Sequence, residues 1–415
     1  MMKVKPIFDE ALLDVYYTTQ KLPKNAFELI YVDTESNDAI GPQRVIEQYC
    51  LKRVDAIFGI PYAYGLAPIA RITPYWNKGV PVFTTSVKVE QFSNKQQFPL
   101  LTRLTETNAL LGKLFVQMFN KYFKYDRVFY YFNEFEDPST SIGKSDCYFT
   151  LNPIKNALSA MEKPVEFESM VFHEHSKDQA YLDEKHGQFL KRASFYARVI
   201  ILCASPNTVR EIMLAAHDLG MATSGEYVFI NIDVSTGSHA EKPWLRSNDT
   251  TAENNEKAKK AYKALKTISL RRSDLREYQN FETRVKNRAE SNYNYKAVTG
   301  KEYEMNNFIS AFYDAVLLYA IALNETLKAG LDPRDGKVIT SKMWNRKFKG
   351  ITGEVSIDMN GDRYSDYSLL DLDEKQDKFV EVAYYSGSDN KLVKVSDFHW
   401  IGGKPPNDDP ICGFV

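Results

Sequence analysis

The sequence lacks the long apolar segments that cross membranes or direct secretion. In this chain of 415 residues, no run reaches the roughly 18 apolar residues that a membrane span requires. The longest candidate, 308–323, is interrupted by Ser310 and Asp314. The N-terminus, Met1 to Pro6, has no apolar run of the kind found in signal peptides. Taken alone, these two absences indicate a cytosolic protein.

The sequence also lacks the motifs of common catalytic and metal sites. It contains no P-loop, no G-x-S-x-G and no G-x-G-x-x-G. Residues 358–362 begin like a calcium-binding loop, but Arg363 and Leu369 stand where that loop requires glycine and glutamate. The cysteines form no C-x-x-C pair and no zinc-type cluster; they are Cys50, Cys147, Cys203 and Cys412. We therefore expect no catalytic residue and no metal.

The sequence also has no excess of charge of either sign. The formal net charge is −1, so nothing attracts nucleic acid or an anionic membrane surface. Hydrophobic residues make up 44% of the chain, which is ordinary for a globular protein. A chain of this length exceeds the size at which one hydrophobic core stops growing. We expect two lobes and no nucleic-acid partner.

What is present is an alternation of strand and helix patterns. Expected strands lie at 27–32, 54–59, 80–84, 127–132, 165–172, 199–203 and 227–232. Expected helices lie at 7–17, after 32 to near 50, from 67, and at 102–123, 148–161, 178–192, 207–219, 259–266, 272–294 and 308–328. Such alternation predicts an α/β fold with parallel sheets flanked by helices. Residues 234–258 are polar and read as a surface excursion, and 355–358 with 367–372 read as a hairpin around Asn360-Gly361.

Several local strings resemble the ectodomain of natriuretic peptide receptors. They are YGLAPIAR at 64–71, CAS at 203–205, REIMLAAH at 210–217, SGEYVF at 224–229 and MWNRKFKGITG at 343–353. The strings GGKPP at 402–406 and PICGF at 410–414 resemble the juxtamembrane end of receptor guanylate cyclases. The resemblance follows the chain in order. It implies a type I periplasmic-binding-protein fold with two lobes.

The resemblance also implies how the chain is divided. Lobe I would take 1–124, lobe II 125–235, a surface excursion and return to lobe I 236–350, lobe II again 351–400, and a juxtamembrane tail 401–415. The helix 308–328 would then belong to lobe I and the hairpin 355–372 to lobe II. The first strand of lobe I should precede Ile7 and is not in the sequence, so we expect the sequence to begin inside that lobe.

Matching positions imply a ligand-binding surface and one disulfide. Cys147 and Cys203 match a disulfide within lobe II. The residues at hormone-facing positions are Tyr64, Arg71, Tyr148, Phe149 and Phe172. The family's acidic contact is Asn152 here, which weakens the charge partner of a basic hormone. The alternative is that these aromatic residues pack on the lobe surface.

Lobe I departs from the family pattern. A family disulfide is absent, because its positions hold Gly41 or Pro42 and Tyr62. A family chloride site uses a serine hydroxyl, matched by Ser36, and two backbone N–H groups. One of those groups falls on Pro61, which has none. The resemblance otherwise implies no cofactor.

The resemblance implies the extracellular part of a plasma-membrane receptor, which would signal through a ligand-induced rearrangement of a homodimer. The ligand would be a peptide hormone or a small molecule, and the parent protein a guanylate cyclase. A clearance receptor without a cyclase, or a small-molecule sensor on the same fold, are the alternatives. Cys50 would form an interchain disulfide or remain a buried free thiol on its helix, and Cys412 would pair with a cysteine beyond the sequence. Glycosylation sequons begin at Asn248 and Asn324.

Overall fold

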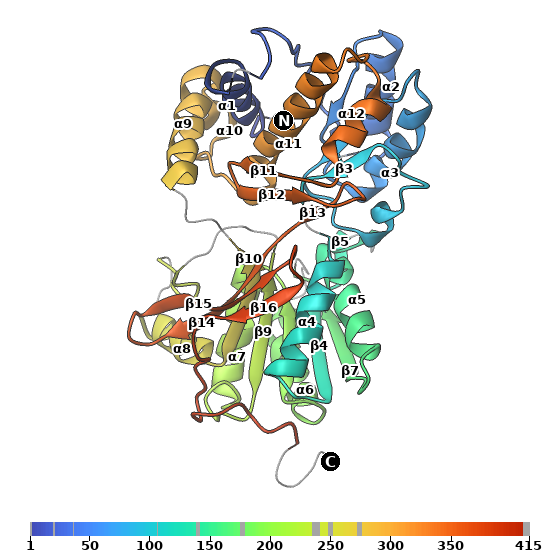
Figure 1. Cartoon of the computed structure of the whole chain (residues 1–415). Coiled ribbons are helices and arrows are strands. Elements are labelled where there is room, and N and C mark those ends of the chain that lie inside the picture. The colour runs from blue at the N-terminus through green and yellow to red at the C-terminus, as the bar shows by residue number, and fades with distance from the viewer. Residues whose placement is uncertain are drawn as a thin grey trace. The chain divides into compact units, whose positions relative to one another are not determined.

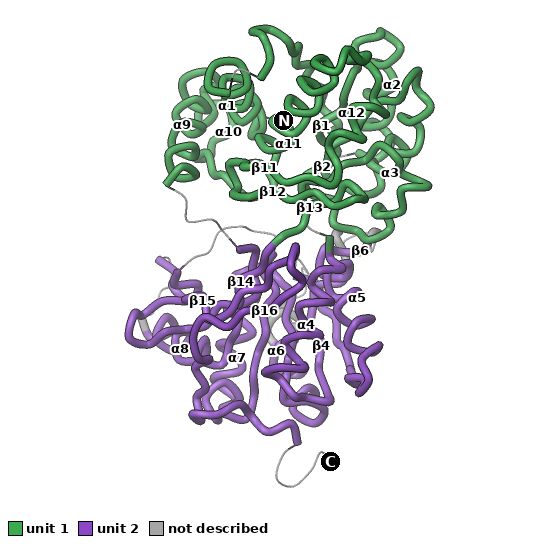
Figure 2. The backbone as a smooth tube through the Cα atoms, in the orientation of Figure 1, with its two compact units in different colours: residues 1–107, 272–365 green, residues 108–271, 366–415 purple. Residues whose placement is uncertain are grey.

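The chain folds into two compact units, which Figure 2 distinguishes by colour. The computed structural model describes residues 2–19, 21–35, 37–105, 107–137, 142–174, 179–234, 241–247, 252–271 and 276–409. Unit 1 comprises residues 1–107 and 272–365, and unit 2 comprises 108–271 and 366–415. The chain therefore passes between the units three times. The predicted α/β class, with mainly parallel sheets flanked by helices, is confirmed (Figure 1).

Within the described residues, unit 1 holds two small sheets. In the parallel sheet, β2 (Val82–Thr84) lies between β1 (Ile57–Phe58) and β3 (Leu101–Arg103). In the antiparallel sheet, β12 (Gly353–Ile357) lies between β11 (Arg346–Gly350) and β13 (Arg363–Tyr364). The α-helices are α1 (Lys5–Leu13), α2 (Ile40–Cys50), α3 (Ala63–Ile72), α9 (Arg276–Tyr293), α10 (Tyr295–Thr299), α11 (Asn307–Lys328) and α12 (Gly336–Met343).

Helix α11 is the centre of the unit 1 core. Its length and apolar composition would suit a membrane span, but 78% of its most apolar window is buried inside the unit. The expected apolar face of the first helix is confirmed, since Phe8 and Ala11 of α1 are buried in the same cluster as α11. Asp314 interrupts the apolar pattern of α11 and is fully buried, which raises its pKa. Its carboxylate accepts a hydrogen bond from the Ile351 N–H at 2.7 Å, so this polar residue ties α11 to the turn after β11.

The described part of unit 2 is built around one eight-stranded sheet in the order β16-β15-β14-β10-β9-β8-β4-β7. The strands are β4 (Arg127–Asn133), β7 (Glu166–Phe172), β8 (Val199–Cys203), β9 (Val228–Asp233), β10 (Leu265–Leu270), β14 (Tyr367–Asp373), β15 (Lys378–Ser386) and β16 (Lys391–Lys394). The five from β10 to β7 are parallel, and β14 to β16 add antiparallel strands at one side. A short pair, β5 (Phe135–Asp137) and β6 (Ile142–Lys144), follows β4.

Helices cover both faces of this sheet. They are α4 (Ala109–Lys121), α5 (Asp146–Ser159), α6 (Gln179–Ser194), α7 (Pro206–Asp218) and α8 (Ala252–Tyr262). Helices α4 and α5 pack on each other, whereas α6, α7 and α8 share a core cluster with the side chains of Phe129, Ile200 and Phe229 from the sheet. Strand residues alternate between faces, so neighbours such as Tyr130 point to the opposite side.

Three expected elements differ from the structure. Residues 27–32 form no strand, and the first strand within the described residues is β1, which pairs with β2. The expected helix 102–123 begins only at Ala109, after the short strand β3. The expected helix 259–266 ends at Tyr262, and β10 follows it. Both strands were hidden by helix-like spacing in the residues beside them.

The expected hairpin and domain boundaries also differ. Asn360-Gly361 does form a turn, but it joins β12 to β13, while β14 pairs with β10 and β15 in the other unit. The hairpin 355–372 is therefore split between the units at 365 rather than lying in lobe II. Helix α4, assigned to lobe I within 1–124, packs on α5 in unit 2. Residues 252–271, assigned to the excursion and return, supply α8 and β10 of unit 2.

Candidate functional site

The chain order of the strands makes one edge of the unit 2 sheet a candidate binding edge. The first parallel strand, β4, lies between β7 and β8, so the connections leave it in opposite directions. In open α/β sheets, ligands bind outside the carboxyl ends of the strands at such a switch point. Here that place lies after Asn133 of β4 and Cys203 of β8. Helices α5 and α7 begin beside it, on opposite faces of the sheet.

Helix α5 presents two predicted contact residues, Tyr148 and Phe149, in its first turn. The Ser145 hydroxyl starts the helix by accepting a hydrogen bond from the Tyr148 N–H at 3.2 Å, and it donates to the Asn133 carbonyl. The helix start is thereby attached to the end of β4. The two rings are half-buried and meet edge to face, with centroids 5.6 Å apart. Asn152, one turn later, is exposed.

The predicted disulfide is confirmed and crosses the switch point. Cys147, in the first turn of α5, is bonded to Cys203 at the end of β8, with the two Cα atoms 5.5 Å apart. The bond is adjacent to Tyr148 in the chain. It therefore attaches the start of α5 to β8, while Ser145 attaches it to β4.

Sequence reasoning missed three polar neighbours of this pair. The Lys144 ammonium lies 5.1 Å from the Tyr148 ring centroid and 2.6 Å from the Glu134 carboxylate. The Asn108 amide donates to the Phe149 carbonyl at 3.0 Å, while its buried side-chain oxygen has no partner within the described residues. The available signal was Ser145 ahead of a helical pattern, which is a capping residue by type.

The structure does not place Phe172 with this surface. Its side chain is 1% exposed and lies in the unit 2 core, where its ring centroid is 4.4 Å from that of Tyr131. Phe172 ends β7 on the face covered by α6. The resemblance gave its position along the chain, but burial depends on the packing of α6, which no local string reveals.

In unit 1, Tyr64 and Arg71 lie two turns apart on α3, the helix that follows β1. Tyr64 is 56% exposed. The Arg71 guanidinium is exposed and lies 5.1 Å from the Phe98 ring centroid, and it donates to the Gln97 side chain at 3.3 Å. A spacing of seven residues puts both side chains on the same face of the helix. Tyr64, in the first turn of α3, lies at the carboxyl edge of the small parallel sheet, whereas Arg71, in the last turn, lies toward its amino edge beside Phe98.

The described residues do not fit the family's chloride site. Ser36 lies outside them. Pro61 has no N–H, and its carbonyl accepts a hydrogen bond from the Ser86 hydroxyl at 3.1 Å. The Tyr62 hydroxyl donates to the Asn37 carbonyl across the same loop. An anion at this site would therefore lack one of the two backbone donors that the family uses.

A buried ion pair fixes the end of β3 in unit 1. The Arg103 guanidinium donates to both Asp362 oxygens at 2.7 Å, to the Val89 carbonyl and to the Ser93 hydroxyl. The Arg103 side chain is completely buried. Burial would raise the pKa of Asp362, but the Arg103 hydrogen bonds and charge outweigh it, and that pKa is lowered. The pair joins the first and third chain crossings on the unit 1 side.

The remaining predicted positions fall outside this surface. Asn248 and Cys412 lie outside the described residues. Asn324 lies in α11, where the sequon's Thr326 is fully buried and donates to the Ala322 carbonyl at 2.8 Å. Asn324 itself is half-buried, and its glycosylation stays a prediction. Cys50 is a free, exposed thiol at the end of α2.

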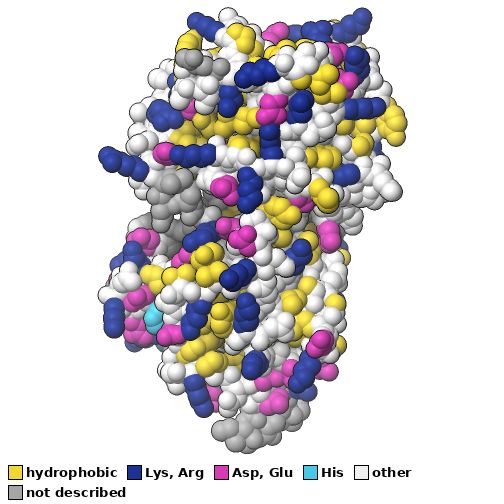
Figure 3. Space-filling view, viewed as in Figure 1, with side chains coloured by type: hydrophobic (Ala, Val, Ile, Leu, Met, Phe, Trp, Pro, Cys, Tyr) yellow, Lys and Arg dark blue, Asp and Glu magenta, His cyan; other side chains and the backbone are white. Residues whose placement is uncertain are grey.

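Charges of both signs are mixed on the surface in view. Figure 3 shows Lys and Arg side chains mixed with Asp and Glu over the visible face, without a broad field of either sign. Both signs occur at the described surface of each unit, as in the ion pairs of Lys78 with Asp332 and Lys242 with Asp377.

Comparison with known proteins assigns the chain to a family. The family model described as "Receptor family ligand binding region" matches residues 4–375. The receptor-type guanylate cyclase gcy-28 of Caenorhabditis elegans is 51% identical over 445 aligned residues, which cover 100% of this chain and 35% of that protein. Atrial natriuretic peptide receptor 3 of Mus musculus is 31% identical over 97% of this chain and 72% of its own length.

A more distant relative extends the same pattern. Atrial natriuretic peptide receptor 2 of Bos taurus is 27% identical over 92% of this chain and 35% of its own length. The chain thus spans about a third of the length of these two longer relatives, at 35% in each case. The chain belongs to the receptor family ligand-binding region, as a ligand-binding domain homologous to those of natriuretic peptide receptors and receptor guanylate cyclases.

Proposed function

We propose that this chain is the extracellular ligand-binding domain of a membrane receptor guanylate cyclase. The observation that carries the proposal is 51% identity to a receptor-type guanylate cyclase along the whole chain. In this function the chain binds a ligand and performs no chemistry. The ligand favours one arrangement of a homodimer by binding it more tightly than the other. The exposed Cys50 is available for a bond between two copies.

The chemistry of the predicted contact residues supports a peptide as the ligand. Tyr148 and Phe149 supply aromatic area in unit 2, and Tyr64 with Arg71 supply an aromatic and a cationic contact in unit 1. Aromatic and arginine side chains are the commonest strong contacts in protein interfaces. The relatives named as atrial natriuretic peptide receptors agree with this class of ligand. Without an acidic group at Asn152, the ligand need not be strongly basic.

A thermal-shift screen tests ligand binding. The purified domain is heated with members of a peptide panel and, separately, of a small-metabolite panel. A ligand at 100 times its Kd stabilises the folded state by roughly 2.7 kcal/mol, which raises the Tm measurably. The response should be lost in Tyr148→Ala/Phe149→Ala and kept in Tyr75→Ala, which removes an exposed ring of unit 1 outside the predicted set. Shifts confined to metabolites would replace the peptide proposal with the small-molecule sensor.

The cyclase part of the proposal is tested separately. The transcript is sequenced past the codon for Val415. We expect an in-frame membrane span followed by a guanylate cyclase domain. A short cytoplasmic tail in its place would contradict the cyclase and support a clearance receptor, while leaving the ligand-binding result unaffected.

A further inference from the structure

Residues 398–408, called the strap here, contain no helix or strand and yet are well anchored to unit 2. The Phe398 and Trp400 rings meet the Phe123 ring edge to face, at 5.5 and 5.8 Å between centroids. The Tyr125 hydroxyl donates to the Pro406 carbonyl at 3.0 Å. Phe123 and Tyr125 precede β4, so the strap runs along the amino edge of the parallel strands, opposite the candidate binding edge.

Beneath the strap lies a buried ion pair of Lys266 and Asp371. The Lys266 ammonium is 2.6 Å from the Asp371 carboxylate, and the two side chains are 1% and 0% exposed. Such pairs are weak evidence for stability, because removing both charges from water costs about as much as their attraction returns. Burial lowers the pKa of Lys266, which reflects that cost. A pair this deeply buried calls for a structural reason.

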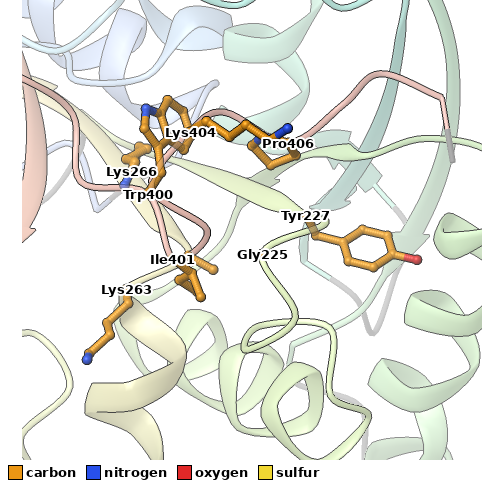
Figure 4. A pocket seen from close by; sticks show the side chains of 9 residues that line it. Gly225, Tyr227, Lys263, Lys266, Trp400, Ile401, Lys404 and Pro406 are labelled. Atoms are coloured by element: carbon orange, nitrogen blue, oxygen red, sulfur yellow. The ribbon is translucent and has the colours of Figure 1, made fainter. Parts of the chain in front are cut away.

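The strap supplies that reason at one residue. Lys266 donates to the His399 carbonyl at 2.6 Å, and the His399 N–H donates to the second Asp371 oxygen at 2.7 Å. Each ion thus uses a remaining hydrogen bond on the backbone of the strap. The Trp400 ring covers Lys266, with its centroid 5.0 Å from the ammonium. Figure 4 shows Lys266 beside Trp400, while the side chains of Lys263 and Tyr227 point away from them.

We propose that the Lys266–Asp371 pair is an anchoring site for this chain's own strap, and that it fixes the path of the strap along unit 2. The pair lies on β10 and β14, which are the strands that carry the chain out of unit 2 and back into it. The strap is therefore attached to the two strands that adjoin the second and third crossings. A shift of the crossings on ligand binding would then pass through the pair to the strap. This role rests on the proposed receptor function.

A backbone substitution tests the anchor while Lys266 and Asp371 stay in place. His399→Pro removes the N–H that donates to Asp371, whereas His399→Ala keeps it. The His399 imidazole, 3.6 Å from Asp371, is lost in both variants, so their comparison isolates the N–H. Amide hydrogen exchange of peptides spanning 398–408 is measured by mass spectrometry in the absence of ligand. Losing one hydrogen bond to a charged group should speed strap exchange by roughly tenfold in His399→Pro. The rate in His399→Ala should stay within about twofold of the wild-type rate.

A second pair of variants guards against misfolding. Lys266→Met/Asp371→Leu replaces the buried pair with apolar groups, a change that is often neutral for the fold. The matched control, Lys263→Met/Glu374→Leu, removes a neighbouring pair at 2.9 Å whose side chains are 35% and 62% exposed. Only the first double variant should free the strap while β8 and β9 keep their protection. If the strap stays protected from exchange in both His399→Pro and Lys266→Met/Asp371→Leu, the proposal is wrong. Failure to find a ligand would not overturn it, because these measurements use none.

Discussion

Tyr62 lies between two glycines that leave room for its ring. A Cβ atom on Gly65 would lie 2.3 Å from the Tyr62 ring, and one on Gly41 would lie 2.8 Å from its hydroxyl oxygen. The hydroxyl donates to the Asn37 carbonyl. The family resemblance places a disulfide at Tyr62 and at Gly41 or Pro42, so here a phenol joins the two segments without a covalent bond.

This arrangement predicts that Gly65→Ala destabilises the protein. Alanine favours helices over glycine by up to about 1 kcal/mol, but the ring is confined on both sides and overpacking typically costs about 1–3 kcal/mol. We expect a net loss of roughly 1 kcal/mol in urea unfolding. Gly187→Ala in α6, where no atom lies within 4 Å, should instead be neutral or stabilising. If Tyr62→Ala does not relieve the loss, the ring is not its cause.

The lowered pKa of Lys95 in unit 1 predicts that the unfolding free energy depends on pH. Burial lowers its pKa from the usual 10.5 to about 8, with the Arg103 charge adding to this and the Asp362 carboxylate opposing it. Between those two values the unfolded chain binds more protons than the folded one, so the unfolding free energy rises with pH. The rise, taken as wild type minus Lys95→Met, should be on the order of 3 kcal/mol across that window. Parallel profiles for the two proteins would contradict the assignment.

At this scale the sequence could predict contacts that depend on type and position, but not those that depend on distant partners. The Cys147–Cys203 bond was implied by the family resemblance and is confirmed, and Tyr148 and Phe149, matched in the same way, lie beside it at the candidate binding edge. Lys266 was not predicted, because a lysine is ordinarily exposed and its partner lies 105 residues further along the chain. Phe172 shows the converse, an aromatic residue expected at the surface that α6 buries.

Among the elements, the disulfide between α5 and β8 is the strongest single tie at the binding edge. It closes a loop of 56 residues, which stabilises the fold by about 4 kcal/mol on the chain-entropy model. Cys147→Ala/Cys203→Ala should therefore lower the urea midpoint without changing the secondary structure. Ligand binding should also weaken, because Tyr148 loses one of its supports. An unchanged midpoint would show that Ser145 and the sheet hold α5 without the bond.

The elements that the sequence predicted poorly are short or carry mixed signals. Strand β10 reads LKTISL, and all six side chains are buried, so it has neither clean alternation nor an uninterrupted apolar run. It follows α8, whose lysine and alanine spacing continues to favour helix. Strand β3 has three residues and includes the buried Arg103, which no local pattern marks as internal. Each strand contains a charged residue, Lys266 or Arg103, which is buried because it pairs with an aspartate far away in the sequence.

For the whole molecule, the three crossings mean that neither unit is a continuous segment. Composition and length predicted two units, but not where the chain divides, because α4 and β10 could be assigned only by their neighbours in space. At the unit 2 end of the crossings, the Arg271 N–H donates to the Asp366 carbonyl at 2.8 Å. Strands β10 and β14 are antiparallel and meet at these residues, as the two arms of a hairpin do.

This adjacency predicts that unit 2 can be isolated by excision. Deleting 272–365 and joining Arg271 to Asp366 through Asn-Gly would close a two-residue hairpin turn. The product, 108–271 joined to 366–409, should unfold cooperatively and retain the Cys147–Cys203 bond. A version ending at 271 would lack β14 to β16 and leave Lys266 without Asp371, so it should not fold. Non-cooperative melting of the joined version would contradict the independence of unit 2.

The Cys147–Cys203 bond also limits where the domain can be made intact. Glutathione and thioredoxin keep cytosolic thiols reduced, so the bond would not persist there. Protein produced in a reducing cytoplasm would carry three thiols within the described residues, with Cys50 the exposed one in the oxidised structure. We expect the candidate binding edge to be the part most altered, because the bond joins α5 to β8 there. The far-UV spectrum of such protein should still look native. An oxidising folding compartment is therefore a requirement for the ligand surface as much as for stability.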